Sequence, residues 1–503
     1  METNEHKDIK KIARGSALSF AGAIVGRGGW FLYQVIAARF LGVEAFGLYM
    51  LAIMAMKITD LISRLGLHTG SMRFVALYRK NDQSRLKGIL ISSFCISFGS
   101  GIFLGLILYL FAGFLAKFVF HKPGLENIII KLSLSVPFMS SMMVVANASQ
   151  GFHTTKYAVL IRDIIQPTLN LLFISLSIFF GLGLVGIIYG YIASYSVALL
   201  VALILITKLF PEIKDKTIKS DYQVKALITY SIPLLFSSFL YLLISWMDTI
   251  MLGIMKTSQD VGIFKAASEI PLILPVFLGA CNSIYAPIAA SLYQHGEFAR
   301  LNHIFKTTTR WAYTLALPVS LILIFSAKEI LMIFGSDFVN KGIPVVIIFT
   351  LAQFINSITG GVGFTLIMTG KQKIEFYNSI GLFFVNFTLN LILIPSLGCM
   401  GAAIATATSV IFSNILRLMQ VYIFYKMQPY GINYLKTIVP AIMATVLLLL
   451  TQKVNLLPIG QLMLNVFIVL GIFLIYTRFT GVDEDEQYIW NLIKQKFAFR
   501  LGA

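Results

Sequence analysis

The sequence is poor in charged residues and in cysteine, and it lacks several signatures of soluble enzymes. Charged residues make up 12% of the 503 residues, against roughly 25% in soluble proteins. The three cysteines are far apart and form no C-x-x-C pair, so they indicate no disulfide framework. There is no G-x-x-x-x-G-K-[ST] segment, and the histidines show no metal-ligand spacing. These absences exclude ATP hydrolysis by a P-loop and give no reason to expect a metal ion or another cofactor.

Catalytic carboxylates are also lacking. Membrane glycosyltransferases and polymerases need acidic residues on a substantial outer loop. The loops expected on the outside here are short, and none carries a paired-carboxylate motif. We therefore predict that the protein is not an enzyme.

Hydrophobic residues, by contrast, make up 57% of the chain. A helix that spans a bilayer needs about 20 apolar residues, so this composition has room for about fourteen spans and for no large soluble domain. Transmembrane strands would be about half as long and would alternate in polarity. We therefore predict an all-α integral membrane protein with about fourteen transmembrane helices. The apolar runs lie at 16–38, 44–65, 88–116, 127–149, 158–180, 183–206, 226–251, 261–291, 308–327, 342–368, 374–395, 399–424, 434–451 and 458–479.

The formal net charge of +18 would suggest nucleic-acid binding in a soluble protein. Here the basic residues are concentrated in alternate loops. With fourteen spans, the tails and loops on the side of the two termini hold about three times as many lysines and arginines as the other side. Because cytoplasmic loops are enriched in these residues, we predict a multi-pass protein of the cell membrane with both termini in the cytoplasm. No nucleic-acid partner is expected.

Two segments outside the spans have an amphipathic pattern. Residues 66–87 and 483–503 each mix apolar and basic side chains, as helices on an anionic membrane surface do. A solvated basic loop explains the same pattern, and the sequence alone does not decide between the two.

Short sequence patterns recur at almost the same distance along the chain, which indicates an internal repeat. The distance between the copies corresponds to six predicted helices. Because six is an even number of membrane crossings, the two copies have the same orientation and the repeats are parallel. Two such bundles enclose a cleft that rocking exposes to each side in turn, as in a transporter. The recurring pairs, 215 to 220 residues apart, are Gly47–Ala52 with Gly262–Ala267, Asn170 with Asn390, and Gly186 with Gly401.

The repeat predicts two six-helix bundles followed by two extra C-terminal helices. Prolines inside the spans favour mobile helices. Pro271 and Pro275, one turn apart in the eighth span, are the best hinge candidates. The predicted segments are a cytoplasmic N-terminal tail at 1–15, an N-terminal bundle at 16–206, a cytoplasmic linker at 207–225, a C-terminal bundle at 226–424, spans thirteen and fourteen at 425–480 and a cytoplasmic amphipathic tail at 481–503.

Charged residues inside spans are costly and are therefore functional candidates. Arg27 lies in the middle of the first span, in G-R-G-G-W, with no acidic residue one turn away. Its guanidinium suits a phosphate group, because it presents parallel N–H donors. A structural ion pair with an acid on another helix, such as Asp248, explains its presence as well.

Lysines and acids also occur close together within spans. Lys57, Asp60 and Arg64 are spaced for local pairing on the second span, and Lys265 and Glu269 on the eighth. Local pairing is the simpler explanation, yet the first group keeps a net positive charge that can face a cleft. We predict that these two lysines bind substrate, together with the arginine of the first span.

Asp248, in S-W-M-D-T, has no such local partner. A buried lone carboxylate takes up a proton readily. Asp248 is therefore the first candidate for coupling transport to H⁺ or Na⁺, with Asp60 and Glu269 as further candidates. Trp30, Tyr33 and Trp246 lie near these charges in the sequence and can stack on a sugar.

Several segments, taken in order and spacing, resemble one family. These are A-A-R-F-L-G at 37–42, F-G-L-Y at 46–49, L-G-L-H-T-G-S-M-R-F at 65–74, D-T-I-M-L-G at 248–253, D-V-G-I-F-K-A-A at 260–267 and Y-A-P-I-A-A-S-L-Y at 285–293. Over essentially the whole chain, the sequence resembles the polysaccharide-biosynthesis exporters. These are the oligosaccharide flippases of the multidrug/oligosaccharidyl-lipid/polysaccharide (MOP) superfamily.

The resemblance implies a MATE-like fold and a function in cell-surface polysaccharide synthesis. Such proteins move a polyprenyl-diphosphate-linked oligosaccharide from the inner to the outer leaflet by alternating access, while the lipid tail stays in the bilayer. Their cavities are lined with cationic residues, and Arg27 and Lys57 match this feature, with Lys265 a weaker match. The implied partners are this lipid-linked substrate, membrane lipids, and a glycan polymerase or glycosyltransferases.

Three alternatives stay open. A multidrug/cation antiporter of the MATE type needs unpaired carboxylates, of which Asp248 is the clear candidate. A flippase for lipid II or a teichoic acid precursor differs in its sugar. A membrane partner of a synthase that transports nothing would tolerate the loss of Arg27 without a change in surface glycan.

Overall fold

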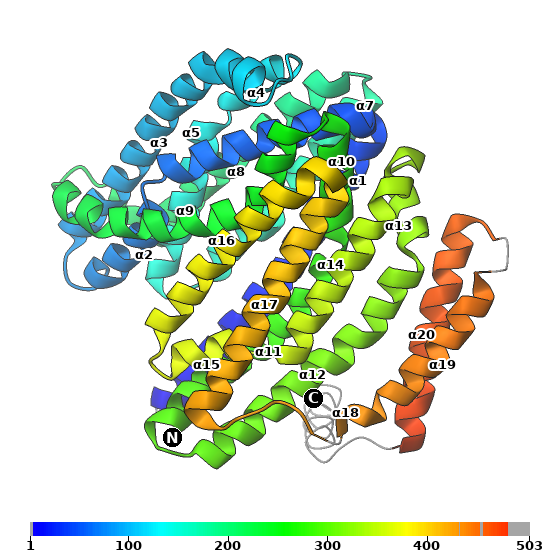
Figure 1. The fold of residues 1–503 in the computed structure, drawn as a ribbon. Coiled ribbons are helices and arrows are strands. Elements are labelled where there is room, and N and C mark those ends of the chain that lie inside the picture. Colours follow the sequence, from blue (N-terminus) through cyan, green and yellow to red (C-terminus); the bar gives the residue numbers. More distant parts are fainter. Residues whose placement is uncertain (1–3, 432, 453–455, 481–503) are drawn as a thin grey trace, which may run out of the picture. The chain divides into compact units, whose positions relative to one another are not determined.

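The computed structural model describes residues 4–431, 433–452 and 456–480, and these residues form helices and no strands (Figure 1). The predicted all-α class is therefore confirmed. The predicted amphipathic tail at 483–503 lies outside the described residues. Of the other amphipathic segment, residues 67–78 form helix α2 (Leu67–Tyr78), which buries Leu67 and Val75.

The protein is a multi-pass membrane protein, although the described residues do not give fourteen separate spans. Eleven helices are long and apolar enough to cross a membrane, or twelve if the bent pair Leu125–Ser133 and Val136–Phe152 counts as one span. The first two predicted spans lie on a single element, α1 (Asn4–Ser63), which is broken only at Gly42. The thirteenth corresponds to the short helix α19 (Ile438–Thr451). These two elements account for the difference between fourteen and twelve, and the bent pair accounts for the difference between twelve and eleven.

The chain divides into two compact units. The first contains residues 1–266, 334–338 and 390–402, and the second contains the rest. The predicted bundle boundaries are not tested by this division and stay a prediction. The elements of the first unit after α2 are α3 (Gln83–Phe114), η1 (Leu115–Val119), α4 (Leu125–Ser133), α5 (Val136–Ala148), η2 (Ser149–Phe152), α6 (Lys156–Val159), η3 (Leu160–Ile165), α7 (Gln166–Phe179), α8 (Gly183–Leu209), η4 (Pro211–Lys214), α9 (Val224–Met255), most of α10 (Ser258–Glu269) and η6 (Ser336–Phe338).

Small residues bring the helices of the first unit close together. At Gly101 of α3, a Cβ atom would lie 2.6 Å from Cα of Pro137 on α5. The Ser140 hydroxyl then donates a hydrogen bond to the carbonyl oxygen of Ser97 at 3.0 Å. Such contacts are typical of membrane helices, which associate through close packing and interhelical hydrogen bonds.

The segment between α8 and α9 is fastened to the start of α3. The buried Lys87 ammonium donates to the carbonyl oxygens of Asp215 at 2.5 Å and Ile218 at 3.1 Å. The Ser92 hydroxyl donates to the Tyr222 carbonyl oxygen at 2.9 Å. This stretch belongs to the predicted linker at 207–225. In the structure it is held against α3 by these side-chain hydrogen bonds.

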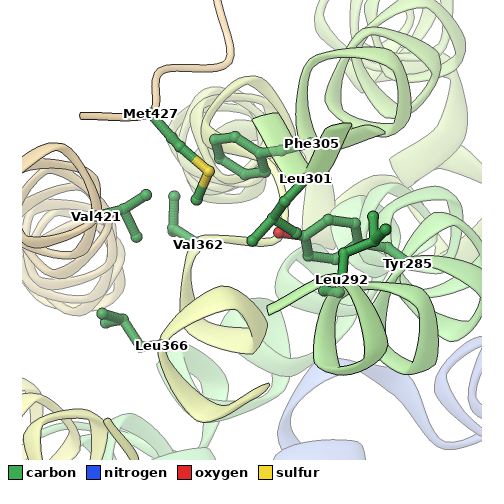
Figure 2. Packing of buried hydrophobic residues seen from close by; sticks show 9 residues of the cluster. Tyr285, Leu292, Leu301, Phe305, Val362, Leu366, Val421 and Met427 are labelled. Carbon is green, nitrogen blue, oxygen red and sulfur yellow. The ribbon is translucent and has the colours of Figure 1, made fainter. Parts of the chain in front are cut away.

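The second unit has its own hydrophobic core, built from α11, α12, α15 and α17 (Figure 2). Tyr285, Phe305 and Leu366 are almost fully buried in it. Figure 2 shows the Met427 side chain pointing toward the Phe305 ring, a favourable arrangement for sulfur and aromatic groups. The elements of this unit are η5 (Ile270–Ile273), α11 (Leu274–Gln294), α12 (Phe298–Phe325), most of α13 (Ala327–Phe334), α14 (Val339–Thr359), α15 (Val362–Met368), most of α16 (Gln372–Leu397), most of α17 (Cys399–Tyr425), α18 (Asn433–Lys436), α19 and α20 (Pro458–Thr480). The end of α16 and the start of α17, residues 390–402, belong to the first unit.

Polar side chains join α16 to α17 inside the second unit. Glu375 and Arg417 form a double ion pair, with N–O distances of 2.9 and 2.5 Å. One turn further along α16, the Asn378 and Gln420 amides exchange hydrogen bonds at 2.7 and 3.0 Å. These contacts satisfy polar groups that are costly at membrane depth.

Candidate functional site

Two lysines and two tryptophans form one cluster in the first unit, which we call the lysine–tryptophan cluster: Trp30, Lys57, Trp246 and Lys265. The Lys57 ammonium lies 4.4 Å from the ring centroid of Trp30 and 5.1 Å from that of Trp246. The Lys265 ammonium lies 4.3 Å from the Trp246 centroid. These are cation–π distances, so Trp246 has two cations in contact with its ring. Both predicted substrate-binding lysines of this unit are therefore brought together.

A single glycine makes this convergence feasible. Trp30 and Lys57 lie on the same element, and in a straight helix their Cα atoms would be about 40 Å apart. Gly42 interrupts α1 with φ 75° and ψ 169°, a conformation that strongly favours glycine. The two arms of α1 can therefore lie side by side, so the lysine of the second arm reaches the tryptophan of the first.

Buried tyrosines hold Trp30 in place. The Trp30 ring stacks on Tyr33 with centroids 5.5 Å apart, and the Tyr33 hydroxyl is hydrogen-bonded to that of Tyr49. The Tyr33 ring also lies 6.2 Å from that of Tyr191, whose hydroxyl donates to Tyr195 at 3.4 Å. All four tyrosines are buried, so the Trp30 ring packs against a buried aromatic group.

The three acidic residues predicted for ion coupling, Asp60, Asp248 and Glu269, differ in their surroundings. Asp60 is buried and forms an ion pair with Arg64, whose Nε lies 3.1 Å from Oδ1, so the expected local pairing on this helix is confirmed. Asp248 accepts a hydrogen bond from the Asn390 amide at 2.8 Å. Glu269 belongs to the second unit. Asp248 therefore has a hydrogen-bond partner on another helix, Asn390 of α16, that the sequence alone did not indicate.

Arg27 lies on the first arm of α1, one turn before Trp30, and its side chain is exposed. Among the residues that the structure describes, it makes no ion pair. The alternative explanation, an ion pair with Asp248, is therefore not present among the described residues. The exposed guanidinium stays available to a ligand.

An ion pair that we did not predict lies next to the first arm of α1. Arg162 donates to Asp163 at 2.7 and 2.8 Å within the π-helical turn η3. At Gly26, a Cβ atom would lie 3.1 Å from the Asp163 carbonyl oxygen. Widened π turns often occur at functional sites. In the sequence, this pair could have been recognised as two adjacent opposite charges inside the apolar run 158–180.

The predicted hinge prolines lie where the eighth predicted span changes from α10 to α11. Pro271 is in the 3₁₀ turn η5, and Pro275 is in the first turn of α11.

Among the described residues, no three His, Cys, Asp or Glu side chains gather closely enough to hold a metal ion.

The comparisons with known proteins agree with this architecture. The family model described as polysaccharide biosynthesis protein matches residues 12–292, which is more than half of the chain. The model described as MatE matches residues 233–392.

Two curated relatives are about one quarter identical. The protein named probable low-salt glycan biosynthesis flippase Agl15, from Haloferax volcanii, is 26% identical over 319 residues, 62% of this chain and 65% of that protein. The capsular polysaccharide biosynthesis protein CapF of Staphylococcus aureus is 26% identical over 52% of this chain and 68% of its own length. The chain thus spans slightly less than two thirds of the length of Agl15.

Two solved structures have a similar fold. The lipid II flippase MurJ in an inward closed conformation has a TM-score of 0.72 and 16% identity, and the match covers 93% of this chain and 98% of that one. An inward-facing multidrug resistance MATE transporter of the MOP superfamily has a TM-score of 0.66 and 16% identity, covering 80% and 94%. At this identity, the likeness shows the fold, and it supports the predicted MATE-like architecture.

Proposed function

The chain belongs to the polysaccharide biosynthesis protein family, and on this basis we propose that it is a flippase for a polyprenyl-diphosphate-linked oligosaccharide. It moves the glycan from the inner to the outer leaflet of the cell membrane by alternating access, without catalysing a reaction. The names of Agl15 and CapF, a glycan biosynthesis flippase and a capsular polysaccharide biosynthesis protein, support this proposal. The lysine–tryptophan cluster is the single structural observation that carries it.

The cluster suits a substrate that is anionic at one end and a sugar at the other. Lys57 and Lys265 place two ammonium groups around the ring of Trp246. A diphosphate attracts both ammonium groups, and charge-assisted hydrogen bonds to phosphate are strong in a site shielded from water. When the lysines turn toward the phosphates, the tryptophan faces are released and can stack on sugar rings.

Arg27 adds a third cation on the first arm of α1. Its exposed guanidinium presents parallel N–H donors that match phosphate oxygens, which an ammonium group does not. In this proposal Arg27 makes the first contact with the diphosphate, and the lysines receive it afterwards. Asp248 is the group that couples the step to an H⁺ or Na⁺ gradient, and the turn at Pro271 and Pro275 is the hinge.

The experiment that tests the proposal compares Lys57→Gln and Lys265→Gln with Lys373→Gln, an exposed lysine at the start of α16. Each is expressed at matched level in cells that lack the native protein, and surface glycan and lipid-linked precursor are measured. Loss of a charge-assisted contact of about 1.5 kcal/mol lowers export roughly tenfold. We expect this loss for the two cluster variants, with precursor retained in the cytoplasmic leaflet, and normal export for Lys373→Gln.

The match of the MatE model to residues 233–392 favours a second candidate, a multidrug/cation antiporter, because this range includes Asp248. An antiporter would give the opposite pattern in the same cells. Surface glycan would stay at the normal level in both cluster variants, and resistance to cationic drugs would change instead. That result would contradict the flippase proposal.

A further inference from the structure

The second unit has a groove among α12, α14 and α19. None of the residues of the lysine–tryptophan cluster lines it. Its volume is about 310 Å³. The groove is lined by Tyr313, Leu317, Phe354, Ile358, Ile438, Ala441, Ile442, Thr445 and Val446. Apart from the Tyr313 hydroxyl and Thr445, these side chains are hydrocarbon. Helices α12 and α14 are long and apolar enough to span a membrane, and α19 is a shorter apolar helix. An apolar groove among such helices suits a lipid chain.

One end of the groove is polar and carries positive charge. The Tyr313 ring stacks on Tyr434 with centroids 5.1 Å apart. Arg310 precedes Tyr313 by three residues on α12, so the two side chains lie on the same face of the helix, and Lys306 is one turn further back.

The Tyr434 hydroxyl is buried without a hydrogen-bond partner among the residues that the structure describes. An unsatisfied buried hydroxyl is costly, and the cost is removed when an acceptor arrives. Arg310, on the same face of α12 as Tyr313, adds positive charge near this place. The polar end therefore offers an O–H donor and a cation to one anionic oxygen group.

We propose that this groove binds an anionic phospholipid, with one acyl chain among α12, α14 and α19 and its phosphate at Arg310 and Tyr434. Basic pockets between transmembrane helices bind such head groups. The positive-inside rule predicts the cytoplasmic side for the loops before α12 and α18, and anionic lipids are enriched in that leaflet. The hydrocarbon lining holds an acyl chain and gives a glycan few hydrogen bonds. This site goes beyond the proposed transport and does not depend on it.

The test uses the purified full-length protein, stripped of lipid in detergent. Phosphatidylglycerol and phosphatidylcholine with the same acyl chains are added in turn, and bound lipid is counted by native mass spectrometry. We expect phosphatidylglycerol to bind at least tenfold more tightly, because only its net charge complements Arg310. Arg310→Gln and Tyr434→Phe should each weaken its binding severalfold, and Arg300→Gln, an exposed arginine on the same helix, should leave it unchanged.

A groove-filling variant separates the chain site from the phosphate site. Ala441→Phe places an aromatic ring among the lining residues, and it should weaken both lipids equally. Thermal melting of each variant without lipid checks that the fold is kept. Equal binding of the two lipids, or unchanged binding in both Arg310→Gln and Tyr434→Phe, would overturn the proposal. So would displacement of phosphatidylglycerol by a polyprenyl phosphate at much lower concentration, since that result assigns the groove to an isoprenoid lipid.

Discussion

Gly47 and Gly262, which are 215 residues apart in the chain, lie in direct backbone contact. A Cβ atom on Gly262 would be 3.2 Å from the amide nitrogen of Gly47 and 3.4 Å from its Cα. The two glycines occupy matching positions in the predicted internal repeat, at the start of G-L-Y-M-L-A and of G-I-F-K-A-A. The second arm of α1 and helix α10 therefore meet at equivalent residues, as elements related by a local two-fold axis do.

Replacing either glycine by alanine should destabilise the protein, because the new methyl group has no space. On Gly47 it would lie 2.7 Å from the carbonyl carbon of Ser258. We expect Gly47→Ala and Gly262→Ala to cost about 1–3 kcal/mol each. Gly279→Ala on α11 is the matched control, because nothing lies within 4 Å of its Cβ position. Thermal unfolding in detergent measures the difference, and equal melting temperatures for Gly262→Ala and Gly279→Ala would show that this contact is not tight.

Arg27 should be required for export, and its geometry should matter as well as its charge. Arg27→Ala removes a cation that makes no ion pair within the described part of the chain, so the fold should tolerate the change. We expect a loss of surface polymer with precursor trapped in the cytoplasmic leaflet. Arg27→Lys keeps the charge but not the parallel donors, and export should recover only in part. Full export by Arg27→Ala would favour a membrane partner of a synthase that transports nothing.

The all-α membrane class could be predicted from the sequence because it depends on local properties. The length of each apolar run and the position of each basic loop are visible without knowledge of contacts. The sequence also predicts the break between the first two spans near Gly42, but in the structure the break occupies one residue rather than a loop. A single glycine with positive φ leaves no trace in hydrophobicity, so the structure joins both spans in one element.

The contacts of the candidate site could not be predicted in the same way. Lys57, Trp246 and Lys265 are each candidates in the sequence, yet nothing in a single sequence shows that the two lysines converge on one tryptophan ring. The contact between Asp248 and Asn390 could not be predicted for the same reason. The two residues are 142 positions apart in the chain, and the packing of α9 against one end of α16 brings them together.

The carboxylate of Asp248 should carry any coupling to an ion gradient. Asp248→Asn removes its charge and keeps an oxygen that can accept the hydrogen bond from Asn390, so the protein should fold normally. In vesicles with an imposed pH or sodium gradient, we expect the variant to transport lipid-linked oligosaccharide at a rate that no longer depends on the gradient. Asn390→Ala keeps the carboxylate and should keep the dependence. Undiminished gradient-dependent transport by Asp248→Asn would remove Asp248 from the mechanism.

Lys122 should stabilise the first unit in a way that depends on pH. Its ammonium donates to the carbonyl oxygens of Lys256 at 2.8 Å and Phe120 at 3.0 Å, and to that of Gly253 in the last turn of α9. A lysine at a helix C-terminus satisfies carbonyls that have no partner within the helix. Lys122→Met should therefore lower stability by about 1–2 kcal/mol.

The pH dependence follows from burial, which lowers the pKa of Lys122 against a smaller opposing effect of Asp260. Between this lowered pKa and the value of about 10.4 in the unfolded chain, the unfolded state binds more protons than the folded state. The contribution of Lys122 to stability therefore rises with pH in that interval, and the gap in melting temperature between the native protein and Lys122→Met should widen. Lys117→Met, which removes an exposed lysine paired with Glu126, is the control and should show a small gap at every pH. A gap for Lys122→Met that narrows as the pH rises would mean that the charged form is the one favoured by folding.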